Sequence, residues 1–223
     1  MDDLDDLADC GAGGVHDPDV MPFFSQWTDG DRDTVARRVL QRQWSSWGAW
    51  TPEDWTLYLV MVDDGTVVGA QSIGAQDYAV TREVVVTAWM GSPYQGRGLG
   101  THGRAAMLAL AFEGLEADWV VSVVQQMNEP SQRVAQKLGF ALDGTQLNAV
   151  RGEQAVSNRY RIDRATWGRH ATIPVEISGL EPCLPLFGLR EPATATAPSP
   201  VRRSNASALS GVQYARDADV ADG

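Results

Sequence analysis

The stretch Gln95-Gly96-Arg97-Gly98-Leu99-Gly100 decides the fold expected for this sequence, because it places three glycines directly before a segment with helical periodicity. Glycine adopts left-handed backbone conformations at little steric cost, so such a loop can turn several N–H groups toward one point. The positive N-terminal end of the following helix would add to the attraction for an anion. The stretch therefore predicts a pyrophosphate-binding loop. The alternative is a tight turn into a helix without a ligand.

A dinucleotide-binding fingerprint is the competing interpretation of these glycines, but that fingerprint follows the first strand of a βαβ unit. In this sequence three strands are expected before the loop. The periodicity of apolar residues and the turn signals predict the following elements: strands Trp55 to Val62, Val67 to Ile73 and Glu83 to Met90, helix Thr101 to Leu115, strand Trp119 to Val124, a helix starting at Asn128 and ending at Gly139, strands Phe140 to Val150 and Val156 to Ile162, and a short helix capped by Asp163. The order β-β-β-α-β-α-β-β predicts an α/β fold, a mixed sheet with helices on both faces.

The flanking segments complete the predicted organisation. Residues 1–30 are expected to form an N-terminal helix, Asp2 to Ala8, and a loop; residues 31–190 form the main domain, whose extension 170–190 packs on it. Residues 191–223 are rich in Ala, Thr, Pro and Ser, which predicts a disordered tail. Two sets of residues are expected to pack in the core or along a cleft: Trp44, Trp47, Trp50 and Trp55 near the first helix of the domain, and Leu180, Leu184, Leu186, Phe187 and Leu189 in the extension.

Composition excludes several classes of protein. The net charge of −11 argues against nucleic acid as a partner, because a nucleic-acid binder needs a basic face, and mildly favours cationic partners such as amines. No apolar run is long enough for a membrane span. The two cysteines, Cys10 and Cys183, provide neither a disulfide framework nor a metal site, so a reducing cytoplasm is the simplest location.

The motif Gln95-x-x-Gly98-x-Gly100 resembles the acyl-CoA pyrophosphate loop of the GNAT superfamily of N-acetyltransferases. Asn128-x-x-Ser131 and Lys137-Leu138-Gly139-Phe140 are similar to the second half of that fold, and the set most resembles the Rim-like branch, the ribosomal-protein alanine N-acetyltransferases. The resemblance covers roughly residues 15–168. The first strand of that fold has no counterpart in this sequence, which would leave the strand Trp55 to Val62 as an edge for a rearranged segment or a second copy, as in a homodimer, to cover.

The resemblance implies that acetyl-CoA or another acyl-CoA binds where two strands splay apart, without a metal, and that the acceptor is a primary amine of a small molecule or a protein N-terminus. It assigns the binding of CoA to these residues: Trp89, Met90, Gln95, Gly96, Arg97, Gly98, Leu99, Gly100, Thr101, Asn128 and Ser131. Arg97 and Arg104 are expected to reach the phosphates of CoA or else to lie in solvent.

Three residues are candidates for the catalytic chemistry. Many relatives have a tyrosine near Ala135 that protonates the departing CoA; here Ser131, or a water that it holds, is the expected substitute, unless its hydroxyl only caps the helix. Strand alternation places Glu83 on the same face as Trp89, so Glu83 is a candidate base acting through water. The alternative is an ion pair of Glu83 with Arg82 or Arg104. His102, Asp77 and water itself are the other candidate bases, and His102 is otherwise an exposed residue of the first helical turn.

Two further functions stay open from the sequence. The same fold could take its acyl group from a carrier protein or an aminoacyl-tRNA, although the intact glycine loop favours CoA. It could also be a non-catalytic acyl-CoA-binding module, which the absence of the tyrosine favours.

Overall fold

The computed structural model describes residues 2–189, which lie within one compact unit of the chain, Met1–Glu191. The predicted tail, 191–223, lies outside the described residues. The elements follow in this order: α1 Asp2–Ala12, α2 Arg32–Ala49, β1 Asp54–Asp63, β2 Thr66–Gln76, α3 Tyr78–Thr81, β3 Glu83–Met90, η1 Ser92–Tyr94, α4 Leu99–Ala109, η2 Leu110–Gly114, β4 Trp119–Gln125, α5 Glu129–Lys137, β5 Ala141–Val150, β6 Glu153–Asp163, α6 Arg164–His170 and η3 Glu181–Phe187.

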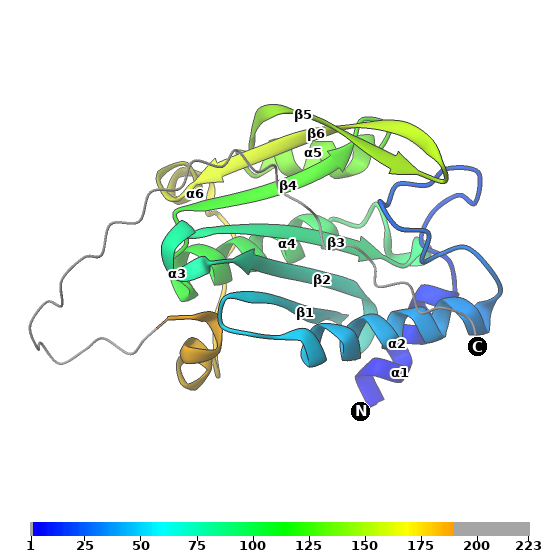
Figure 1. Cartoon of the computed structure of the whole chain (residues 1–223), viewed down its shortest axis with the longest axis horizontal. Helices are drawn as coiled ribbons and strands as arrows, with labels where there is room; N and C mark the ends of the chain where they lie inside the picture. The colour runs from blue at the N-terminus through cyan, green and yellow to red at the C-terminus, as the bar shows by residue number, and fades with distance from the viewer. Residues whose placement is uncertain (1, 190–223) are drawn as a thin grey trace, which may run out of the picture. The chain divides into compact units, whose positions relative to one another are not determined.

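The strands form one six-stranded mixed sheet in the order β1-β2-β3-β4-β6-β5, as Figure 1 shows. Only the β3–β4 pair is parallel. This confirms the predicted α/β fold, to which the structure adds the short helix α3. No strand precedes β1 within residues 2–189, and β1 pairs there with β2 alone.

Helices cover both faces of the sheet, and strands β1, β2 and β3 contribute side chains to an apolar cluster on each face. On one face Leu7 of α1 and Val39 of α2 pack against Ala70 of β2. On the other face Leu108 of α4 and Ala135 of α5 pack over the sheet, together with α6 and η3. The glycine loop connects β3 to α4, which lies on this second face (Figure 1).

The aromatic prediction for the first helix is half right. Trp50 and Trp55 lie in the second cluster and contact Phe187 of the C-terminal extension, with ring centroids 5.3 and 4.8 Å apart. Trp44 and Trp47, in contrast, are more than half exposed. The buried residues of α2 form a narrow stripe, Val35, Val39 and Gln43. Trp44 is turned by about 100° from Gln43, and Trp47 follows one turn later, near the end of the helix and past its last buried residue. Helical spacing alone did not reveal how narrow this stripe is.

The C-terminal extension packs on the domain much as predicted. Phe187 and Leu189 are buried, and Leu180 and Leu184 pack against the second cluster. The predicted packing of Leu186 is wrong, since this side chain is 54% exposed. It lies in the short helix η3, in which only Phe187 is buried, so one apolar residue of the turn is left facing outward.

Candidate active site

The glycine loop has the backbone geometry that a ligand cradle requires. Gly96 and Gly98 have φ angles of +73° and +86°, in the left-handed region that favours glycine. A Cβ atom built on either glycine would meet nothing within 4 Å, so the space beside the loop is open. Leu99 and Gly100 begin α4, and the first N–H groups of a helix have no intrahelical partner. The loop can therefore present several N–H donors to an anion.

Gln95 holds the shape of this loop. Its side-chain amide donates hydrogen bonds to the carbonyl of Met90, at 2.8 Å, and to the carbonyl of Val15, at 2.7 Å. The side chain of Gln95 is thus committed to the protein backbone. Arg97 is exposed and lies 3.4 Å from the carboxylate of Asp63 at the end of β1, so its guanidinium stands at the rim of the loop.

Beside the loop, β3 and β4 splay apart. They pair only from Glu83 to Val85 on β3 and from Trp119 to Val121 on β4; beyond these residues both strands continue without pairing to each other. The edge of β3 that faces β4 therefore has no strand partner from Val86 to Met90, although the carbonyl of Met90 already accepts the hydrogen bond from Gln95. Unpaired backbone N–H and C=O groups are ready to bond to an extended amide chain. The side chain of Trp89 packs against Trp27 on the face of α1 and α2, with 5.2 Å between the ring centroids. The backbone of Trp89 is turned toward β2, since Gly91, two residues on, donates its N–H to Val68 of β2.

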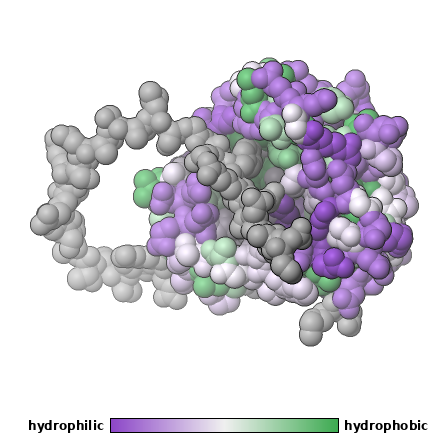
Figure 2. All heavy atoms as spheres, turned by 45° about the vertical axis from the view of Figure 1, so that its right-hand side comes forward, coloured by the Kyte–Doolittle hydropathy of each residue, from purple (hydrophilic) through white to green (hydrophobic). Residues whose placement is uncertain are grey.

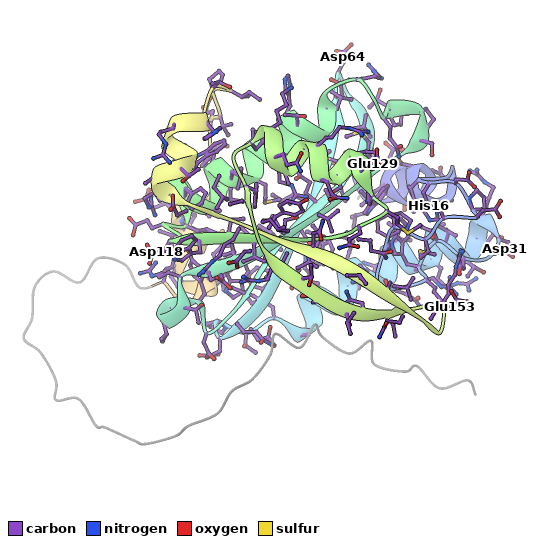
Figure 3. The ribbon with its side chains drawn as sticks, turned by 90° about the horizontal axis from the view of Figure 1, so that it is seen from above. His16, Asp31, Asp64, Asp118, Glu129 and Glu153 are labelled. Carbon is purple, nitrogen blue, oxygen red and sulfur yellow. The ribbon has the colours of Figure 1, made fainter. Side chains whose placement is uncertain are left out.

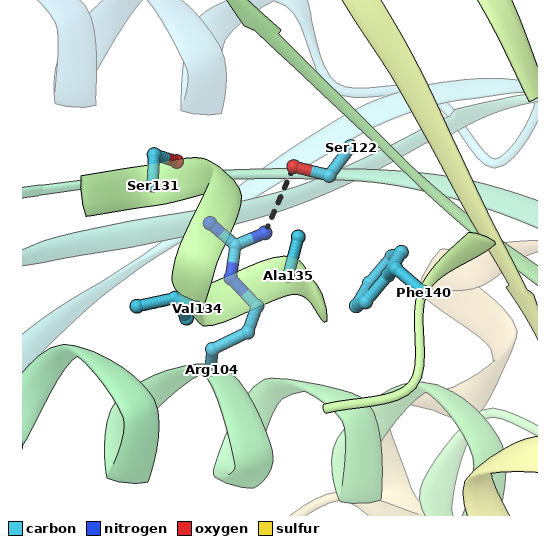
Figure 4. A pocket seen from close by; sticks show the side chains of 6 residues that line it. All are labelled: Arg104, Ser122, Ser131, Val134, Ala135 and Phe140. Carbon is cyan, nitrogen blue, oxygen red and sulfur yellow. Dashed lines mark hydrogen bonds between the residues drawn. The ribbon is translucent and has the colours of Figure 1, made fainter. Parts of the chain in front are cut away.

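The first turn of α5 borders the same region. Asn128 caps the helix, its side-chain oxygen accepting a hydrogen bond from the N–H of Ser131 at 3.2 Å. The side chain of Ser131 lines a small pocket of about 10 Å³, room for about one water molecule, that is partly open to solvent. The other lining residues, shown in Figure 4, are Arg104, Ser122, Val134, Ala135 and Phe140. Ser131 is therefore near the splay while its backbone is held by the cap.

Arg104 does not have the position expected for it. The sequence suggested a residue at the CoA phosphates or in solvent, whereas the structure buries Arg104 to 7% exposure between α4, α5 and β4. Burial lowers the pKa of Arg104 to about 10, so its guanidinium remains charged at neutral pH. The signal was present in the sequence, because helical spacing places Arg104 on the apolar face of α4, one turn before Leu108.

Glu83 lies at the closed end of the splay. Its carboxylate pairs with Arg161 of β6 at 2.7 Å and with Arg159 at 3.3 Å, rather than with Arg82 or Arg104. Met90 follows Glu83 by seven positions, which in a strand corresponds to about 23 Å. The role of Glu83 as a base stays a prediction, but these ion pairs favour a structural role.

The other two candidate bases are also distant from the splay or exposed. Asp77 caps α3 after the end of β2, beside a second pocket that is lined by Pro52 and Leu189 among others. Figure 3 labels Asp118, which precedes β4 at this closed end, and His16 and Glu129 toward the open end. His102 is an exposed residue of the first turn of α4.

A wall that the sequence did not predict stands at the open end, formed by the segment between α1 and α2, residues 13–31. Gln125, the last residue of β4, donates a hydrogen bond to the carbonyl of Phe23 at 2.8 Å. Arg151, in the β5–β6 turn, forms an ion pair with Asp29 at 2.6 Å. The hydrogen bond from Arg151 lowers the pKa of Asp29. In Figure 2, where this end of the sheet comes forward, the surface is mainly hydrophilic with small hydrophobic patches.

Neither a metal-binding group nor a membrane-spanning helix occurs among the described residues. Within residues 2–189 no three His, Cys, Asp or Glu side chains are grouped so that they could hold a metal ion. None of the helices in the described part of the chain combines the length and the apolar character needed to cross a bilayer.

Comparison with known proteins supports the geometry. A family model described as an acetyltransferase (GNAT) domain matches residues 1–141. Three similar solved structures share the fold at 17–21% identity: RimJ of Mycobacterium smegmatis in complex with CoA-disulfide (21% identity, TM-score 0.53, covering 65% of this chain and 69% of that one), the ribosomal-protein-S5-alanine acetyltransferase of Vibrio fischeri (17%, 0.55, 74% and 91%) and a GCN5-related N-acetyltransferase of Brucella melitensis (18%, 0.61, 75% and 74%). Two of these neighbours are of the Rim type, in line with the resemblance seen in the sequence. Glycine loop, splayed strands and family match agree: this chain belongs to the GNAT acetyltransferases.

Proposed function

We propose that the protein transfers an acetyl or other acyl group from acyl-CoA to a primary amine by direct attack of the amine, through a tetrahedral intermediate. The observation that carries this proposal is the open cradle at Gly96 and Gly98, at the start of α4 and beside the unpaired edge of β3. A pyrophosphate fits the cradle because both the free N–H groups and the helix end favour an anion. The amides of the pantetheine arm fit the edge of β3 from Val86 to Met90.

Positioning and electrostatics supply most of the proposed catalysis. A backbone N–H near the end of β3 would donate to the thioester oxygen, where negative charge develops as the amine attacks. The hydroxyl of Ser131 would donate to the sulfur. The amine's proton passes to water in the cleft, because Glu83 and Asp77 lie at the closed end of the strands.

The acceptor would enter at the wall formed by residues 13–31. The net charge of −11 attracts an ammonium from a distance, and Asp17, Asp19 and Asp31 add negative charge to this wall itself. One structural neighbour is named for acetylating an alanine of ribosomal protein S5. A peptide with an N-terminal alanine therefore belongs in any acceptor panel, beside small amines.

Two measurements in sequence test this function. Calorimetry with acetyl-CoA should show binding at one site per chain, and a panel of amines should then release free CoA thiol, with the acylated product identified by mass spectrometry. Absence of acetyl-CoA binding would instead indicate a different acyl donor. Binding without turnover on a broad panel would indicate a non-catalytic acyl-CoA-binding module.

A further inference from the structure

Arg104 is a buried cation without a counter-ion. Its exposed fraction is 7%, and within residues 2–189 no carboxylate lies within ion-pair distance of it. Its guanidinium forms one hydrogen bond, to Ser122 Oγ at 3.5 Å, the outer limit for such a bond. An unpaired buried charge destabilises a fold by several kcal/mol, so a cation in this state is expected to meet an anion when a ligand binds.

The guanidinium lies at the point where the sheet opens. Ser122 is the first residue of β4 after the last residue that pairs with β3. Figure 4 shows Arg104 reaching from α4 toward Ser122, with Ser131 of α5 nearby. All three line the same pocket, whose remaining side chains are apolar. The polar side-chain groups that line this pocket are two hydroxyls, of Ser122 and Ser131, and the guanidinium of Arg104. Arg104 is the only titratable group among the six lining residues.

This set of donors suits an anion, and the proposed reaction generates one next to Ser131. The amine nitrogen forms the new C–N bond with the acyl carbon, the C–S bond breaks, and its electron pair leaves on sulfur as the CoA thiolate. The amine's proton goes to water, so atoms and charges balance. The charge that moves onto sulfur has no other cation in this pocket.

We propose that Arg104 is a catalytic residue that stabilises the thiolate of the departing CoA by its positive charge, so that the thiolate leaves without being protonated by an acid. This inference rests on the proposed acyl-CoA chemistry and extends it to the leaving group. It also explains why a charge is kept on the apolar face of α4, where an aliphatic side chain would pack without the desolvation cost.

The test compares Arg104→Met with the wild type, and uses Arg133→Met as a matched control because Arg133 is an exposed arginine of α5 paired only with Glu129. Free CoA is titrated into each protein by calorimetry between about pH 6 and 9, across the ordinary pKa of a thiol, ~8.5. In the wild type and in Arg133→Met the pKa of the bound thiol should be lowered by about one unit or more, which corresponds to about tenfold tighter binding of the thiolate. In Arg104→Met this shift should disappear.

Acetyl-CoA provides the second readout, because its sulfur carries no charge. Arg104→Met should bind acetyl-CoA within about threefold of the wild type while kcat falls about tenfold or more, as expected when an interaction is made only in the transition state. Arg104→Lys, which keeps the charge, should restore part of both effects. Melting of the unliganded Arg104→Met should be unchanged or higher, since removal of a buried charge relieves its desolvation cost. Arg104→Gln provides the same comparison if the methionine variant does not fold.

Three outcomes would overturn this role. Equal loss of affinity for CoA and acetyl-CoA at every pH would place Arg104 at a phosphate. A preference for acyl groups with a terminal carboxylate that is lost in Arg104→Met would assign the site to the acyl chain. An unchanged thiol pKa and kcat would leave Arg104 structural. If instead the wild type binds neither form of CoA, the proposed function itself fails, and the inference fails with it.

Discussion

Replacement of Gly98 by valine separates a ligand-binding loop from a mere turn. Gly98 has a φ of +86° and nothing within 4 Å of a built Cβ. Gly65, in the β1–β2 turn, has a φ of +73° and equally open surroundings, so Gly65→Val provides a matched control for backbone strain. A branched residue held in this region costs about 1–3 kcal/mol, and both variants should lose stability to a similar extent.

Only Gly98→Val should lose the ligand. Two hydrogen bonds from N–H groups to a charged phosphate are worth about 1.5–3 kcal/mol each. Their loss corresponds to about 10²–10⁴-fold weaker binding of acetyl-CoA, at about 1.4 kcal/mol per tenfold. Urea unfolding of both variants and calorimetry with acetyl-CoA measure the two effects separately. The reasoning is refuted if Gly98→Val, still folded, binds acetyl-CoA as tightly as Gly65→Val does.

Three further predictions follow from contacts in the described chain. Glu83→Gln should keep the rate of acyl transfer within a few-fold of the wild type but unfold at lower urea concentration, because it loses two ion pairs; a rate loss of about 10²–10⁴-fold would restore its role as the base. Phe187→Ala should destabilise the domain by about 3–5 kcal/mol, whereas exposed Leu186→Ala should change stability by less than about 0.5 kcal/mol, both measured by urea unfolding. The hydrogen bond from Arg151 lowers the pKa of Asp29, so this pair stabilises the folded protein above the pKa of an unfolded aspartate, about 3.9. The stabilisation is lost as pH falls through the lower pKa of Asp29 in the folded protein. The difference in unfolding free energy between wild type and Arg151→Met should therefore shrink toward zero below about pH 4.

Local signals in the sequence were sufficient for the elements and for the glycine loop. The predicted strand Glu83 to Met90 matches β3 residue for residue, and Asn128 caps α5 as expected from an asparagine before a proline. Alternation, capping and turn chemistry act over a few residues, so they can be read without the fold. The family resemblance then predicted that two strands splay apart beside this loop.

The side-chain environment of the site could not be predicted in the same way. Glu83 meets Arg161 across 78 positions of sequence, and Gln125 meets Phe23 across 102. Such pairs depend on the strand order β3-β4-β6 and on the path of the segment between α1 and α2, and no local pattern encodes either. Arg104 is the exception, since its place on an apolar helical face was visible but was outweighed by the usual preference of arginine for the surface.

The anchoring of residues 13–31 has a consequence for acceptor selectivity. This segment is joined to the loop by Gln95, to β4 by Gln125 and to the β5–β6 turn by Arg151. A wall tied at three points is already assembled before an amine arrives, so little conformational entropy remains to be lost on encounter. Selectivity between amines would then depend on the shape and charge of side chains that are already in place, rather than on an ordering of residues 13–31 when the amine binds. Single substitutions between the anchors should retune which amines are accepted while acetyl-CoA binding stays unchanged.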